Sequence, residues 1–147
     1  MITKRELLVE VWYPADPEPN AAPGSYYSQP LADLFSTIFS VPGNRLHGVL
    51  ANAYPDAPLA ADEARYPVVI FDPGFSGMPR QYTIFLEELA SHGYVVFSTS
   101  RPYITTLTAF PDGRLIEPLS ADRLATLWAP RDIYEAEFSE VWVPDLE

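Results

Sequence analysis

The residues best placed for chemistry form a short loop, PGFSG at 73–77, that follows an apolar run. Five of the six residues at 67–72 are apolar and three are β-branched, which predicts a strand buried on both faces. A glycine loop between such a strand and a helix presents backbone N–H groups to an anion or to the oxyanion of an acyl-transfer reaction. The alternative is a tight strand-to-helix connection without a chemical role.

Ser76 is the candidate nucleophile within this loop, but its sequence context argues against that role. Gly74 stands two residues before it and Met78 two residues after it, so the pattern G-x-S-x-G is not met. A serine nucleophile also needs a base within hydrogen-bond reach, and no histidine is near in the sequence. We therefore expect Ser76 to contribute to the loop rather than to attack a substrate.

The two histidines are also expected to be non-catalytic. His92 precedes Gly93 at the predicted end of a helix, where an imidazole interacts favourably with the helix dipole, so a capping role is expected. His47 lies in a polar segment and is expected to be solvated. The histidines are far apart and lack metal-site spacing, so no metal or other cofactor is expected.

The elements around the loop place it at one edge of a sheet. Residues 80–91 predict a helix with an apolar stripe, and Gly93 predicts its C-terminal cap. Residues 94–99 form a second apolar run, so the unit is strand, loop, helix and strand. Such crossovers are nearly always right-handed and make the strands parallel, which puts the loop where α/β proteins bind ligands. The helical stripe consists of Tyr82, Phe85, Leu86, Leu89 and Ala90.

The same patterns predict the other segments of the chain. They are an outer strand at 6–13, an irregular loop packed on the body at 14–30, a helix at 31–39, a weaker helix at 45–54, a short extended piece at 114–119, and a helical pattern from Ser120 to Trp142 that Pro130 interrupts. Tyr103, Thr105, Thr106 and Phe110 follow the second parallel strand and are candidates for the mouth of a pocket. The adjacent Glu87 and Glu88 are expected on a solvated helix face.

Composition excludes several classes of function. At 147 residues and 48% hydrophobic, the chain can bury one ordinary core. The net charge of −11 would repel phosphate backbones, so no nucleic-acid partner is expected. No run is long and apolar enough to span a membrane, and the N-terminus is too polar for a signal peptide, so a cytoplasmic protein is expected, with a secreted parent left open.

Five motifs in order resemble a known family. They are VEVWYPA at 9–15, YPVVIFDPGFSG at 66–77, LASHGYVVFSTSRP at 89–102, FPDGR at 110–114 and VWVPDLE at 141–147. Together they are similar to the α/β-hydrolase family of platelet-activating factor acetylhydrolase-like and dienelactone hydrolase-like serine esterases. The resemblance implies the N-terminal half of an α/β-hydrolase fold, a mostly parallel sheet flanked by helices, as a single partial domain over residues 1–147.

The resemblance also implies roles for the loop. In the family the strand ends roughly as S-H-G-x-G, and the residue after the first glycine donates its backbone N–H to the oxyanion hole. Phe75 occupies that position here, after Gly74. This sequence differs from the family pattern at two positions, because Pro73 stands where the histidine is usual and Ser76 stands where a second glycine is common. The resemblance further implies a small-molecule ester or a lipid-like substrate, as in lipases. Gly74 and Ser76 in the loop, together with Tyr103 and Phe110 after the second parallel strand, are the residues expected to contact it.

The family's G-x-S-x-G serine, aspartate and histidine follow later in the chain, and these 147 residues contain no such motif. We therefore expect a carboxylic ester hydrolase. This chain is expected to supply its oxyanion loop and to be inactive alone. The expected partner is a complementary C-terminal segment of the fold or a second copy. The alternative is a non-catalytic α/β domain that binds a ligand or a partner through the same loop.

Overall fold

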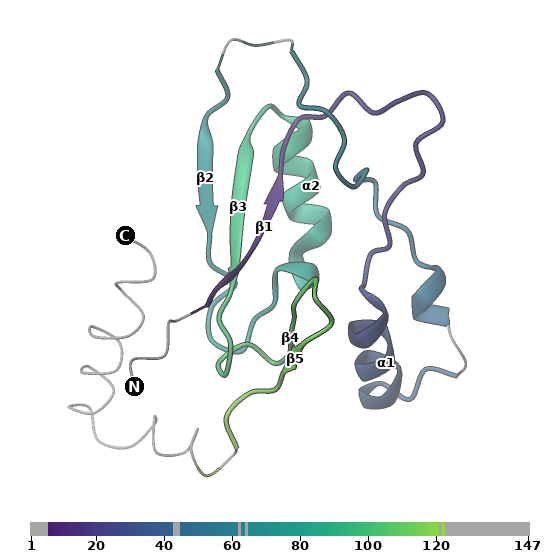
Figure 1. Ribbon diagram of the computed structural model, residues 1–147, viewed down its shortest axis with the longest axis vertical. Helices are drawn as coiled ribbons and strands as arrows, with labels where there is room; N and C mark the ends of the chain where they lie inside the picture. The colour runs from purple at the N-terminus through teal and green to yellow at the C-terminus, as the bar shows by residue number, and fades with distance from the viewer. Residues whose placement is uncertain (1–5, 43–44, 62, 64, 121, 123–147) are drawn as a thin grey trace, which may run out of the picture.

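The computed structural model describes residues 6–42, 45–61, 63, 65–120 and 122 (Figure 1). The helical pattern predicted after Ser120 and the motif at 141–147 fall outside these residues, apart from the first positions of the former. The strands are β1 (Leu8–Trp12), β2 (Val68–Phe71), β3 (Val95–Ser100), β4 (Thr108–Ala109) and β5 (Leu115–Ile116); the helices are α1 (Gln29–Ile38), η1 (Arg45–Gly48), η2 (Pro79–Tyr82) and α2 (Thr83–Ser91), of which η1 and η2 are 3-10 turns.

The main sheet has the strand order β1-β3-β2. β2 and β3 are parallel, with Val69 opposite Val96, which confirms the predicted strand, loop, helix and strand unit. β1 is antiparallel to β3 and lies at the other edge of the described sheet, as predicted for an outer strand. One strand pair of two is antiparallel, so the described sheet is mixed and not mostly parallel.

α2 covers one face of this sheet and forms the core with it (Figure 1). Leu86 and Val96 are completely buried, with Trp12 and Ala90 beside them. The helix ends as predicted, because Gly93 adopts a φ of +87° and its N–H donates to the carbonyl of Ala90 at 3.0 Å. The burial of the predicted stripe is uneven, and its Phe85 is half exposed.

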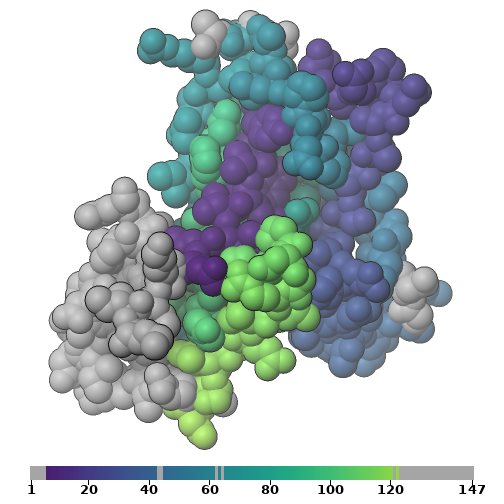
Figure 2. Space-filling view, in the orientation of Figure 1, coloured from purple at the N-terminus to yellow at the C-terminus, as the bar shows by residue number. Residues whose placement is uncertain are grey.

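The prediction that residues 67–72 are buried on both faces is wrong for the described structure. Val68 and Ile70 in β2 are each 62% exposed. The reason is that α2 packs on the opposite face and that β2 has one strand neighbour among the described residues. Ile70 stands in register with Phe97 of β3, which is in register with Val11 of β1, and all three are exposed. In Figure 2 the purple atoms of the N-terminal strand likewise lie at the molecular surface.

A second core joins α1 to the loops at the carboxyl ends of β2 and β3. Leu31 and Phe35 of α1 pack with Met78 and Leu107, and all four are buried. Tyr27 packs on Phe35 with the ring centroids 5.1 Å apart, which confirms that the irregular segment at 14–30 lies against the body. The predicted α1 is therefore present, and its buried side faces the region of the PGFSG loop.

The long excursion between β1 and β2 returns along its own path. Asp16 donates its N–H to the carbonyl of Pro58, and Ala60 donates to the carbonyl of Pro14, both at 2.9 Å. Farther out, Gly24 donates to the carbonyl of Ala53 at 2.8 Å. Residues 49–54 form no helix, and Leu50 instead makes an isolated antiparallel bridge with Ser25, so the helix predicted at 45–54 is wrong beyond its first turn, η1. In the part of the chain that is described, no helix is long and apolar enough to cross a membrane.

Candidate functional site

The PGFSG loop leaves β2 through a backbone that only certain residues adopt. Gly74 has a φ of +82°, which suits glycine. Ser76 has a φ of +60°, a left-handed conformation that costs a residue with a Cβ roughly 1–2 kcal/mol. Such strain persists only where the surroundings hold the backbone in place, and it is common at functional sites. Contacts on both sides of the loop supply that restraint.

Asp72 holds the beginning of the loop. Its Oδ1 accepts the N–H of Gly74 at 2.9 Å and also pairs with the guanidinium of Arg101. Arg101 follows β3 directly and is only 5% exposed. The ion pair therefore links the carboxyl ends of the two parallel strands just below the loop. The sequence contains one signal for the hydrogen bond between Asp72 and Gly74, namely an aspartate two residues before a glycine, which favours an Asx turn.

Thr106 holds the end of the loop. The carbonyl oxygen of Ser76 accepts two hydrogen bonds from it, one from the backbone N–H at 3.2 Å and one from the hydroxyl at 2.8 Å. The sequence predicts Thr106 as a pocket-lining candidate, and the structure brings it against the loop backbone. Its contact fixes the carbonyl of the strained residue.

The inside of the loop is closed by one further bond. Gly77 donates its N–H to the carbonyl of Gly74 at 3.2 Å. The peptide between Gly74 and Phe75 is trans, so the N–H of Phe75 points opposite to that carbonyl and thus away from Gly77. A Cβ on Gly77 would lie 2.2 Å from the carbonyl oxygen of Pro73, so only glycine fits there.

An ion pair anchors the helix that follows the loop. Arg80 in η2 pairs with the carboxylate of Glu10 in β1, and its guanidinium lies 5.7 Å from the ring centroid of Trp12. Burial raises the pKa of Glu10 above its ordinary value, and the positive charge of Arg80 opposes that rise. The pair ties the start of the helical segment to the sheet, so both ends of the loop lead into fixed structure.

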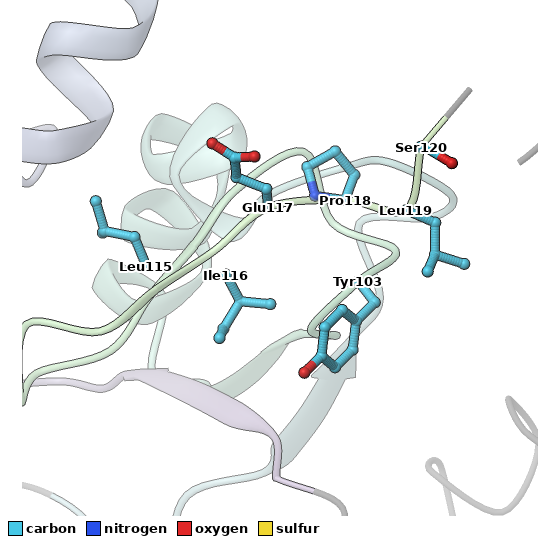
Figure 3. A pocket seen from close by; sticks show the side chains of 7 residues that line it. All are labelled: Tyr103, Leu115, Ile116, Glu117, Pro118, Leu119 and Ser120. Atoms are coloured by element: carbon cyan, nitrogen blue, oxygen red, sulfur yellow. The ribbon is translucent and has the colours of Figure 1, made fainter. Parts of the chain in front are cut away.

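Tyr103 lines an open cavity of about 600 Å3 with residues 115–120 (Figure 3). Its φ is +72°, and its carbonyl accepts the N–H of Leu119 at 2.8 Å, which closes the segment that contains β4 and β5. The cavity wall is mostly apolar and includes Leu115, Ile116, Pro118 and Leu119. Gly74, Phe75 and Ser76 are not among the residues that line it.

Phe110 lies in the turn between β4 and β5 and does not line this cavity. The guanidinium of Arg114 covers its ring at 4.6 Å. Arg114 also binds Glu6 and Asp112, and its hydrogen bonds lower the pKa of both carboxyls while they raise the pKa of Arg114. The hairpin is thus held by charge pairs at the surface.

A second cavity of about 720 Å3 lies between the body and the long excursion. Its lining includes Trp12, Tyr13, Tyr27, Tyr54 and Glu87. Burial raises the pKa of Tyr27. The carboxylate of Glu87 accepts the backbone N–H groups of Asn52 at 2.8 Å and Ala53 at 3.2 Å. Glu88 is exposed as predicted, and Glu87 is partly exposed but also binds this partner segment, which lies 35 residues away and which no local sequence pattern marks.

The two histidines lie away from the loop. His92 caps α2, with its Nδ1 2.8 Å from the carbonyl oxygen of Glu88, as predicted. The Nε2 of His47 is 2.9 Å from Oδ1 of Asp33, so the imidazole is paired and not simply solvated. Within the described residues, neither imidazole forms a hydrogen bond with Ser76, and no group of three His, Cys, Asp or Glu side chains could hold a metal ion.

Replacing Gly77 with alanine tests the packing of the loop. Gly77→Ala should lower the free energy of unfolding by about 1–3 kcal/mol, because the new Cβ collides with backbone. The matched control is Gly48→Ala, whose Cβ would meet no heavy atom within 4 Å and which should change stability by no more than about 0.5 kcal/mol. Chemical denaturation measures both, and equal values would contradict the close approach.

Comparisons with known proteins agree with this architecture. Residues 3–101 match the model of the family described as platelet-activating factor acetylhydrolase, isoform II. Among solved structures, the ferulic acid esterase from Streptomyces cinnamoneus is similar, with 33% sequence identity and a TM-score of 0.63. The alignment covers 77% of this chain and 31% of that enzyme, so the chain spans less than a third of its length. No curated protein gave a significant match.

The family match covers the first strand, the PGFSG loop, α2 and β3, and it confirms the resemblance to acetylhydrolase-like esterases. The family and the structural neighbour together imply the α/β-hydrolase fold. The chain belongs to the family of platelet-activating factor acetylhydrolase, isoform II.

Proposed function

We propose that this chain is the N-terminal part of a carboxylic ester hydrolase of the serine type and supplies one oxyanion-hole donor, the backbone N–H of Phe75. The observation that carries the proposal is the strained loop after β2, which is held at both ends and lies within the matched family region. The similarity to a ferulic acid esterase supports ester chemistry. Neither Pro73 nor Ser76 is an obstacle, since the donor is a backbone group.

In this proposal the loop acts on charge that develops during the reaction. A serine attacks the ester carbonyl, and the carbonyl oxygen becomes an anion in the tetrahedral intermediate. A fixed N–H lowers the energy of that anion without having to reorient, which is why oxyanion donors contribute strongly. The serine, its histidine base and the acidic residue would come from polypeptide other than these 147 residues, which contain no G-x-S-x-G.

The substrate would be a small ester or a lipid-like ester. Gly74 and Ser76 flank the donor, and the mostly apolar cavity beside Tyr103 could receive an acyl or aryl group. Phe110 supports this proposal least, because Arg114 covers its ring. We also propose that further strands lie beyond β2 in the complete fold and that they make its sheet mostly parallel.

The donor role predicts a contrast between two changes at one position. In a protein that combines this chain with a segment bearing the nucleophile, Phe75→Pro removes the N–H and should lower kcat by about 100- to 1,000-fold. Phe75→Ala keeps the N–H and should lower kcat far less. Steady-state kinetics with p-nitrophenyl acetate measures both variants. Equal losses would refute a role for the N–H.

The chain of 147 residues by itself should not hydrolyse p-nitrophenyl acetate above background. Loss of the serine and its base removes several orders of magnitude of rate, which leaves only weak residual stabilisation. A fluorophosphonate probe should not label the chain, as intact-mass spectrometry would show. Stoichiometric labelling of Ser76 would instead make that residue the nucleophile, and Ser76→Ala would serve as its control.

We further propose that the sheet is completed by a partner, either a complementary segment of the same parent polypeptide or a second copy of the chain. β2 is an edge strand within the described sheet, and its Val68 and Ile70 are exposed. Val9, Val11 and Phe97 extend the apolar surface across the other two strands. An apolar edge of this kind tends to pair with another chain or to aggregate.

The 147 residues alone should therefore associate or aggregate in solution. Analytical ultracentrifugation should show dimers or larger species, or a monomer without a cooperative thermal transition. Val68→Lys together with Ile70→Lys should reduce the association, because charged side chains on an edge strand oppose pairing. A monodisperse monomer of 16.4 kDa that unfolds cooperatively would overturn the proposal and favour a self-contained binding domain.

A further inference from the structure

The turn that follows β3 reaches back to the PGFSG loop and is itself well fixed. Thr105 donates its N–H to the carbonyl of Arg101 at 2.9 Å, and its hydroxyl accepts the N–H of Arg101 at the same distance. Both side chains are buried, and Leu107 packs beside Met78 in the second core. Thr106 therefore projects from a turn that is closed on one side and packed on the other.

A relay of two peptide planes connects Thr106 to the N–H of Phe75. The hydroxyl and the N–H of Thr106 both bind the carbonyl oxygen of Ser76. That carbonyl shares a planar peptide with the N–H of Gly77, which in turn binds the carbonyl oxygen of Gly74. The Gly74 carbonyl shares its own plane with the N–H of Phe75. Each peptide plane is rigid, so fixing the first orients the second.

We propose that Thr106 is a positioning residue for the Phe75 N–H, an inference that rests on the proposed esterase function. Its hydroxyl makes the shorter of the two hydrogen bonds to the carbonyl of Ser76, at 2.8 Å against 3.2 Å for the bond from its backbone N–H. The hydroxyl thereby holds a residue whose left-handed backbone would otherwise relax. Thr106 touches the loop and acts on the reacting atoms only through it.

The proposal separates the hydroxyl of Thr106 from its shape. Thr106→Val removes the donor and keeps the volume, whereas Thr106→Ser keeps the donor. Thr37→Val is the matched control, because the hydroxyl of Thr37 also donates to a backbone carbonyl, that of Asp33 at 3.0 Å, but on α1 away from the loop. Circular dichroism checks that each variant folds. If Thr106→Val does not fold, Thr106→Cys replaces it, since a thiol is only a weak donor.

Two measurements on the protein that combines this chain with its nucleophile-bearing segment form the test. Thr106→Val should lower kcat for p-nitrophenyl acetate about tenfold with KM nearly unchanged, because the affected interaction is made only in the transition state. Amide hydrogen exchange at the Gly77 N–H should accelerate by roughly tenfold as the loop opens more often. Thr106→Ser and Thr37→Val should leave both values within about twofold of the unmodified protein.

The outcomes distinguish this inference from the function on which it rests. An unchanged kcat and unchanged exchange at Gly77 in Thr106→Val would overturn the inference while ester hydrolysis stands. Equal losses in Thr106→Ser and Thr106→Val would also overturn it, because they would assign the effect to the methyl group. If the unmodified protein hydrolyses no ester, the proposed function fails, and the exchange rates alone then decide whether the hydroxyl of Thr106 fixes the loop.

Discussion

The ion pair of Asp72 with Arg101 is the interaction on which the site depends most. It joins the carboxyl ends of the two parallel strands, and the same carboxylate oxygen receives the N–H of Gly74. One side chain thus sets both the spacing of the strand ends and the first turn of the loop. Arg101 is almost fully buried, whereas the side chain of Asp72 is partly exposed, so loss of Asp72 would take a carboxylate partner from a buried charge and should cost more stability than loss of an exposed ion pair.

The molecule combines a tightly held loop with an open sheet. At the carboxyl ends of β2 and β3, the PGFSG segment is restrained by three sets of hydrogen bonds: Asp72 accepts the N–H of Gly74, Thr106 donates to the carbonyl of Ser76, and Gly77 donates to the carbonyl of Gly74. On the face opposite α2, the described strands expose Val68 and Ile70 to solvent. The two properties are compatible, since the loop is fixed by contacts within the described residues and does not rely on that face.

The order of strand, loop and helix followed from local patterns, since the apolar runs, Gly74 and Gly93 each act within a few residues of themselves. The contacts that define the site did not follow. Arg101 binds Asp72 across 29 positions, and Glu87 binds Asn52 across 35, and no periodicity marks such pairs. The exposure of Ile70 also did not follow from the sequence, because the sequence of an apolar strand is the same whether or not another element packs on its face.

The excursion between β1 and β2 has its two ends hydrogen-bonded side by side, through Asp16 to Pro58 and Ala60 to Pro14. These two hydrogen bonds therefore close the long segment at its base, where the chain leaves the sheet and returns to it. Residues inserted between positions 16 and 58 would not alter strand order or register. Each doubling of the length of this loop costs only about 0.6 kcal/mol of loop-closure entropy. The region beyond residues 16 and 58 is thus a place where relatives of this protein can differ greatly in length while they keep the same sheet.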